Sequence, residues 1–166
     1  MQNLKVKSYI DSIQTSLDNI LLTVKDLSVD EIRWKPSENE WSILQILSHI
    51  GEATLFWLGE LDQVLEKPGS EWGRGLDDPA RLAAVENPEQ LDVQQVIEKV
   101  QQLKGAVREK LSGVSDDRLS EQNPHRNFAK FGNKSVSFLI EHFLVDHING
   151  HLEQINRNLS KLNKNF

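Results

Sequence analysis

Residues 134–161 read KSVSFLIEHFLVDHINGHLEQINRNLSK, and apolar side chains recur along them at three- and four-residue steps. Steps of that size place side chains on one side of an α-helix, so the stretch predicts a long helix with one buried face. That face carries Val136, Ile140, Phe143, Ile148, Ile155, Leu159 and Leu162. His147 and His151 fall on the same face, one turn apart, so the helix directs two imidazoles toward the interior.

Three further stretches upstream show the same helical periodicity. They are predicted as helices at residues 3–27, at about 42–67 and at about 92–112. The start of the second one is ambiguous, because Ser37 with Glu40 and Ser42 with Gln45 both have capping-box spacing. The sequence therefore leaves the first residue of this helix undetermined by about one turn.

The segments between the helices are rich in structure breakers. Residues 68–89 hold three glycines and three prolines, which predicts a long connection that could contain one short helix, and Trp72 within it could fold back onto the helices. Residues 114–133 are predicted to be a loop. Residues 27–32 are echoed by residues 114–119, which suggests two similar helix pairs.

Four long helices without a strand pattern predict an all-α protein with the architecture of a four-helix bundle. The chain has 166 residues, of which 38% are hydrophobic. That is enough to bury a core without disulfides, so one domain over residues 1–166 is the simplest organisation.

Composition excludes several classes of function. The net charge of -6 leaves no basic stripe for a phosphate backbone, so no nucleic acid partner is expected. The absence of cysteine removes disulfides, thiolate ligands and a cysteine nucleophile. No signal peptide and no apolar run of membrane-spanning length is found, so the protein is expected to be cytoplasmic with no membrane partner.

Three histidines form the candidate site. His147 and His151 can bind one ion from adjacent turns, and His49 on the helix predicted at 42–67 is the best candidate for a third ligand. Three protein ligands leave one position for water or substrate, as in catalytic zinc sites. A cation held by three neutral imidazoles would lower the pKa of a bound water or thiol and create the nucleophile.

Other polar residues near these histidines have weaker claims. Gln154 lies along the helix from His151 and could orient it, and Glu52 could add an oxygen ligand or accept an imidazole proton. His142 is five residues before His147 and is predicted to face elsewhere. His125 is predicted to be a surface residue in a loop, although that loop could cover the mouth of the site.

Two alternatives to an enzyme remain open. The histidines could be hydrogen-bonded to one another in a bundle without metal, or the protein could be a noncatalytic metal-binding stress-response module or a dimeric interaction protein. Trp34, Trp57 and Trp72 could serve such an interface, although core packing explains them more simply. No glutamate follows His147, and no phosphate-binding glycine loop or serine elbow is found, which argues against a zinc peptidase, a nucleotide enzyme and a serine hydrolase.

The chain resembles the DinB superfamily, also called DinB/YfiT-like. The resemblance rests on Trp41-Ser42-Ile43 followed by His49, on residues 146–155 with the sequence DHINGHLEQI, and on residues 30–36 with the sequence DEIRWKP. It implies a four-helix bundle in up-down-down-up order, with a divalent metal, often zinc or nickel, at the positions of His49, His147 and His151.

The resemblance also implies a range of activities. Members with known activities are thiol-dependent transferases or isomerases that use bacillithiol, mycothiol or glutathione, and many others are described only as hydrolases. We therefore expect a metal-dependent enzyme acting on a small-molecule substrate, either a transferase that takes a low-molecular-weight thiol or a hydrolase. Dimers are common in the family, so a homodimer is expected.

Overall fold

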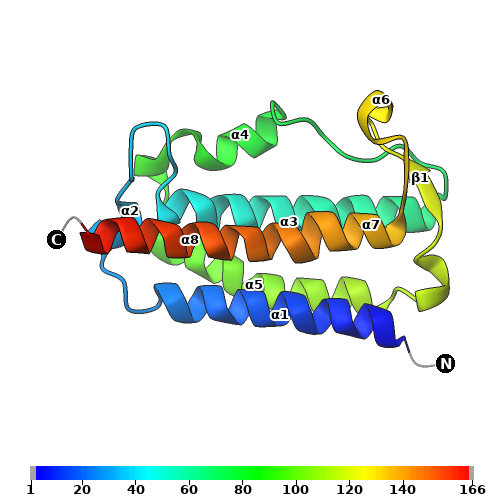
Figure 1. Ribbon diagram of the computed structural model, residues 1–166, viewed down its shortest axis with the longest axis horizontal. Helices are drawn as coiled ribbons and strands as arrows, with labels where there is room; N and C mark the ends of the chain where they lie inside the picture. The colour runs from blue at the N-terminus through cyan, green and yellow to red at the C-terminus, as the bar shows by residue number, and fades with distance from the viewer. Residues whose placement is uncertain (1–2, 165–166) are drawn as a thin grey trace.

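The computed structural model describes residues 3–164, and its main body consists of four long helical rods (Figure 1). The first three rods are α1 (Leu4–Val24), α3 (Ile43–Glu66) and α5 (Val93–Ser112). The fourth joins α7 (Val136–Ile140), the π-helical turn η3 (Glu141–Val145) and α8 (Asp146–Lys164) end to end. The predicted all-α four-helix bundle is confirmed.

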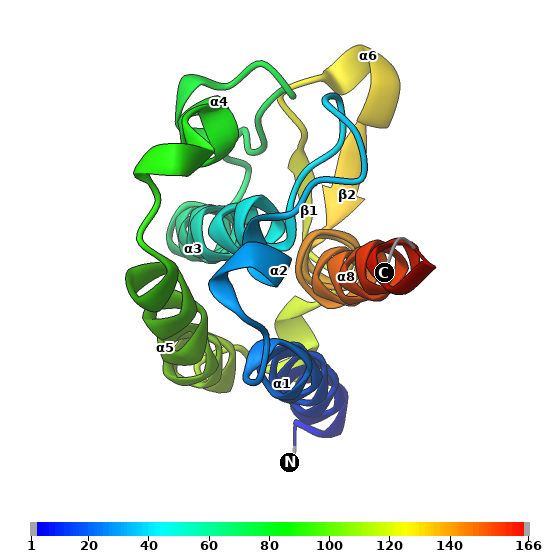
Figure 2. The same ribbon diagram turned by 90° about the vertical axis from the view of Figure 1, so that its left-hand side faces the viewer.

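The rods follow the up-down-down-up order. Helix α3 runs opposite to α1, α5 runs in the same direction as α3, and the fourth rod runs back (Figure 1). Because α3 and α5 are parallel, residues 67–92 must return along the bundle between them. This crossover segment contains α4 (Pro79–Glu86) and the single turn η1 (Pro88–Gln90), and α4 packs against α3 (Figure 2).

Side-chain caps set where two of the helices begin. The Ser42 hydroxyl accepts a hydrogen bond from the Gln45 N–H at 3.1 Å, and the Gln45 side chain accepts one from the Ser42 N–H at 3.0 Å. This capping box decides the ambiguous start of α3 in favour of Ser42. Ser28 and Glu31 make the same box at the start of α2 (Val29–Arg33). Helix α1 ends before the predicted residue 27.

The prediction that residues 114–133 form only a loop was wrong. They contain the turn η2 (Asp116–Arg118), strand β1 (Gln122–Pro124) and the short helix α6 (Phe128–Phe131), and β1 pairs antiparallel with β2 (Asn133–Ser135). Strands of three residues are too short to produce a recognisable alternation in sequence. This β1–α6–β2 excursion rises on the same side of the bundle as the crossover segment (Figures 1 and 2).

Trp72 attaches the crossover segment to this excursion. Its backbone N–H donates to the Pro124 carbonyl at 3.1 Å, and its backbone carbonyl accepts from the Arg126 N–H at 2.7 Å. The side chain is 2% exposed and its ring contacts Trp57 of α3 at a centroid distance of 6.2 Å, so the prediction that Trp72 folds back onto the helices is confirmed.

The fourth rod differs from the regular helix that its periodicity predicts. In turn η3 each backbone hydrogen bond spans five residues instead of the four of an α-helix. The buried stripe therefore passes through Leu144 and Ile148, and His147 and His151 lie at its edge, partly buried. None of the helices between residues 3 and 164 has both the length and the apolar composition of a membrane-spanning segment.

Candidate metal centre

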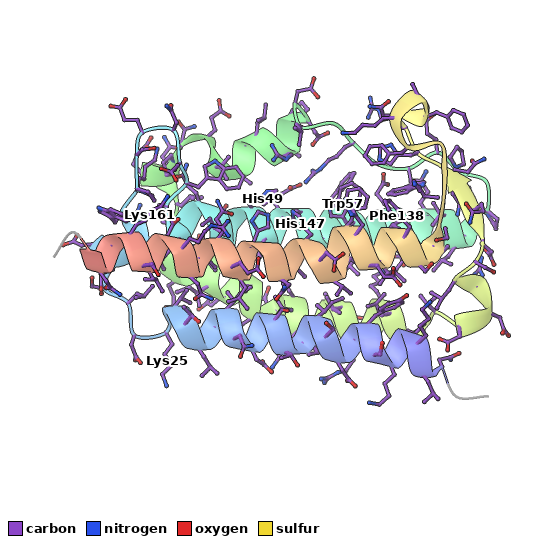
Figure 3. All side chains as sticks on the ribbon, in the orientation of Figure 1. Lys25, His49, Trp57, Phe138, His147 and Lys161 are labelled. Carbon is purple, nitrogen blue, oxygen red and sulfur yellow. The ribbon has the colours of Figure 1, made fainter. Side chains whose placement is uncertain are left out.

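Three histidines from two antiparallel rods meet on the side of the bundle that the crossover segment covers. His49 lies on α3 and His147 on α8 (Figure 3), and His151 lies one turn further along α8. The Nε2 atom of His147 is 3.2 Å from Nε2 of His49 and 3.0 Å from Nε2 of His151. One nitrogen from each ring can be chosen so that all three lie within 4.8 Å of one another, and we call this group the histidine triad.

The spacing within the triad suits a common cation. Nitrogen ligands lie about 2.0–2.1 Å from zinc, which separates two tetrahedral ligands by roughly 3.4 Å. The Nε2 separations of His147 from His49 and from His151 are slightly shorter than that, and the three ligand nitrogens lie within 4.8 Å of one another. An ion could therefore be accommodated by small movements of the rings.

Hydrogen bonding alone does not satisfy the triad. An imidazole nitrogen offers one position in the ring plane, either an N–H or a lone pair. His147 Nε2 can therefore form one linear hydrogen bond, yet it has two nitrogen neighbours within 3.2 Å. A cation would accept all three lone pairs, so the geometry favours the metal-binding reading over internally hydrogen-bonded histidines.

Burial keeps the triad neutral. Desolvation, followed by the neighbouring histidines and then Arg81 and Arg74, lowers the pKa of His49 to about 2. Desolvation is likewise the largest cause that lowers the pKa of His147 to about 3, and it lowers the pKa of His151. Neutral imidazoles have the free lone pairs that a metal requires.

The Nδ1 atoms of the three histidines differ in their hydrogen bonding. Nδ1 of His151 lies 2.8 Å from Oε1 of Gln154, so the predicted neighbour is in contact with the ring. Nδ1 of His49 and of His147 are buried and have no hydrogen-bond partner among the described residues. The Trp41 ring packs against His49 and His151 at centroid distances of 5.1 and 6.4 Å and forms a wall of the site.

Glu52 is not brought into the triad. Its carboxylate accepts two hydrogen bonds from the Arg74 guanidinium, at 2.6 and 2.8 Å. Arg74 also pairs with Asp78 at 3.2 Å and stacks over the Phe56 ring, with 3% of its side chain exposed. The carboxylate considered as a ligand instead fastens the crossover segment to α3.

The two remaining histidines differ from each other. His142 is exposed and stacks on Phe138, outside the triad, as its position predicts. His125 was predicted at the surface, but its ring is buried against Trp72 and Phe131, with 4% of the residue exposed. The error arose because the loop containing His125 is pinned by the Trp72 backbone, a contact with no local signature in the sequence.

Two arginines near the triad were missed by the sequence analysis. Arg74 and Arg81 both come from the crossover segment, and their charges contribute to the lowered pKa values of His49 and His147. The Arg81 guanidinium carbon lies 6.0 Å from the centroid of the Trp41 ring. Since nothing in the sequence indicates which part of a long connection returns over a given helix, these residues could not have been selected from it.

Comparisons with known proteins agree with this architecture. A sequence model of the DinB superfamily matches residues 12–155. A solved structure of YfiT from Bacillus subtilis superimposes with a TM-score of 0.78 at 12% identity, covering 98% of this chain and 90% of that chain. YfiT is described as a probable metal-dependent hydrolase with an unusual four-helix bundle topology. No curated protein sequence matches this chain.

Proposed function

This chain belongs to the DinB superfamily, and on that premise we propose that it is a metal-dependent hydrolase of small molecules whose divalent cation is bound by His49, His147 and His151. The observation that carries the proposal is the convergence of three neutral imidazoles from α3 and α8. The description of YfiT, which shares the fold, supports it further.

The donor set fits a divalent first-row metal. Three imidazoles suit zinc and nickel, and they leave at least one coordination position for another ligand. When bound, such a cation lowers the pKa of a coordinated water and so supplies a nucleophile at neutral pH. We propose zinc or nickel on the chemistry of the ligands.

The side chains around the triad have separate tasks in this proposal. Gln154 holds the ring orientation of His151 through the contact at 2.8 Å. Trp41 closes one wall and excludes water from it. Arg81 supplies positive charge that favours an anionic group beside the triad, whereas the charge of Arg74 is matched by Glu52 and Asp78. Glu52 is already bound by Arg74, so we do not assign it as the general base.

Transfer to a thiol is the competing chemistry at the same site. It would need an external low-molecular-weight thiol, because the chain has no cysteine. Hydrolysis needs only water. A panel of small esters and amides, assayed with metal and with or without glutathione, separates the two. Turnover that is equal with and without thiol supports hydrolysis, whereas turnover only with thiol makes the protein a transferase.

The metal assignment has its own test. Protein purified without a histidine tag is expected to carry about one divalent ion per chain by elemental analysis. His147→Ala is expected to lose the ion, and His142→Ala, which removes an exposed imidazole one π-turn away, is expected to keep it. Equal metal content in both variants would refute the assignment. Metal without turnover of any substrate would favour the noncatalytic module.

A further inference from the structure

A second set of polar groups lines a cavity on the same side of the bundle as the histidine triad. The cavity has a volume of about 1000 Å³ and lies between residues 74–79 of the crossover segment and residues 125–131 of the β1–α6–β2 excursion. Phe143, in its wall, lies one turn before His147, whereas none of the three triad histidines lines the cavity.

His125 offers this cavity an unused hydrogen-bond donor. The Asn127 N–H donates to Nδ1 of His125 at 2.9 Å, so that nitrogen presents a lone pair. Burial lowers the pKa of His125, which leaves the ring neutral with its proton on Nε2. No described residue accepts a hydrogen bond from Nε2, and this atom is not completely shielded from solvent. A buried ring thus presents one free N–H at the cavity wall.

The backbone of Gly73 packs closely against the His125 ring. Its φ angle is +103°, and a Cβ atom at this position would lie 2.5 Å from Nε2 of His125. Any side chain at residue 73 would therefore collide with the imidazole. The close packing of the Gly73 backbone therefore holds the His125 ring in place at the cavity wall.

The charges and the aromatic rings of the cavity indicate the type of ligand. Arg126 and Lys130 line it and take part in no ion pair among residues 3–164. On the opposite wall, Asp78 is occupied by Arg74, which leaves Asp77 as the opposing acidic group. Phe131 and Phe143 supply flat apolar surface. A ligand with a negative group and an apolar body matches these features.

We propose that this cavity binds a small organic anion, whose carboxylate or phosphate accepts the Nε2 proton of His125 near Lys130 and Arg126 while its apolar body lies along Phe131 and Phe143 toward the triad. Small organic anions are then the substrate class of the proposed hydrolase. Only their identification as substrates rests on the proposed function. The binding itself requires no metal. His125 is then a substrate-binding residue.

Binding is tested with benzoate, phenyl phosphate and phenylacetate, with benzyl alcohol as the uncharged probe. The readout is the indole N–H resonance of Trp72, whose ring lies 4.7 Å from the His125 ring. We expect the three anions to shift this resonance saturably and benzyl alcohol to bind at least tenfold more weakly, about the value of one charge-assisted hydrogen bond. No saturation by any of the three at about 1 mM, the upper end of ordinary substrate affinities, overturns the proposal.

Matched variants locate the anion. His125→Phe keeps the aromatic packing and removes the donor, so it is expected to weaken binding about tenfold. His125→Gln restores an N–H and is expected to recover much of this loss. Lys130→Met is expected to weaken binding about two- to fivefold, whereas Lys134→Met, the same charge change outside the cavity wall, leaves it unchanged. Equal binding by His125→Phe and the unmodified protein contradicts the proposal.

The same titration on His147→Ala separates this proposal from the metal assignment. Anion binding is expected to survive in that variant, because His125 and Lys130 lie outside the triad. Binding that is lost in His147→Ala but kept in His125→Phe would place the anion on the metal and would overturn the cavity assignment. Failure of hydrolysis with retained binding would instead refute only the proposed function.

Discussion

Acidification is expected to destabilise the metal-free protein strongly between about pH 7 and about pH 5. In the folded chain, burial holds the pKa of His49 at about 2 and that of His147 at about 3, whereas an unfolded histidine titrates near about 6.5. At about pH 5 the unfolded chain therefore binds protons that the folded chain does not. Free energy of unfolding consequently falls as the pH falls, and it is restored above the unfolded pKa.

The magnitude follows from the unfolded pKa. Both folded pKa values lie far below about pH 5, so their exact values hardly affect the result. Each ring then loses about 2 kcal/mol between about pH 7 and about pH 5, and the two together lose about 4 kcal/mol. His151 acts in the same direction. A loss of this size is a large share of the roughly 5–15 kcal/mol that a domain typically has.

Urea unfolding of chelator-treated protein, followed by tryptophan fluorescence at both pH values, measures this loss. His49→Leu is expected to reduce the pH-dependent difference by about 2 kcal/mol, because one buried titrating group is gone. His142→Gln, which changes an exposed ring, is the control. If unmodified protein and His49→Leu lose the same free energy on acidification, the buried neutral triad is not the cause and the reasoning fails.

Three further changes test contacts around the site. Arg74→Met leaves the Glu52 carboxylate without its two hydrogen bonds and should lower the free energy of unfolding by about 2 kcal/mol. This is less than the cost of breaking a fully buried pair, because the Glu52 side chain is 20% exposed. An unchanged urea midpoint would show that the contact is dispensable. Ser42→Ala removes half of the capping box and should cost about 1 kcal/mol in the same assay, with Ser42→Asp as the variant expected to retain stability. Gln154→Leu frees the His151 ring and should weaken metal affinity about 10- to 100-fold in competition with a chromogenic chelator, and unchanged affinity would speak against an orienting role.

The approach of the three histidines could be predicted from sequence because each signal is local. Two rings four residues apart share a helix face whatever the fold. The His49 ring lies on the inner face of another strongly periodic helix, and a bundle brings inner faces together. The structure places Nε2 of His49 at 3.2 Å and Nε2 of His151 at 3.0 Å from Nε2 of His147. The role of the three histidines as metal ligands remains a prediction.

The polar surroundings of the triad could not be predicted in the same way. Arg74, Arg81 and His125 owe their positions to segments between the long helices, where no periodicity fixes the orientation of a side chain. The turn η3 is also absent from the sequence reading, because an extra residue in one turn changes the phase of the apolar pattern by less than a short stretch can reveal. In our proposal these are the residues that distinguish one ligand from another.

The order of the helices explains why the long helices and the crossover segment contribute different residues to the site. If α5 ran opposite to α3, a short loop could join them, and the side of α3 that carries His49 would be open. Because the two are parallel, the chain returns along the bundle, and residues of that return bring Arg74 and Arg81 beside the triad. Trp72 fixes the return to β1 and thereby forms the cavity that contains His125. In this protein the long helices position the rings, and the crossover that their direction requires supplies the charge and the shape of the pocket.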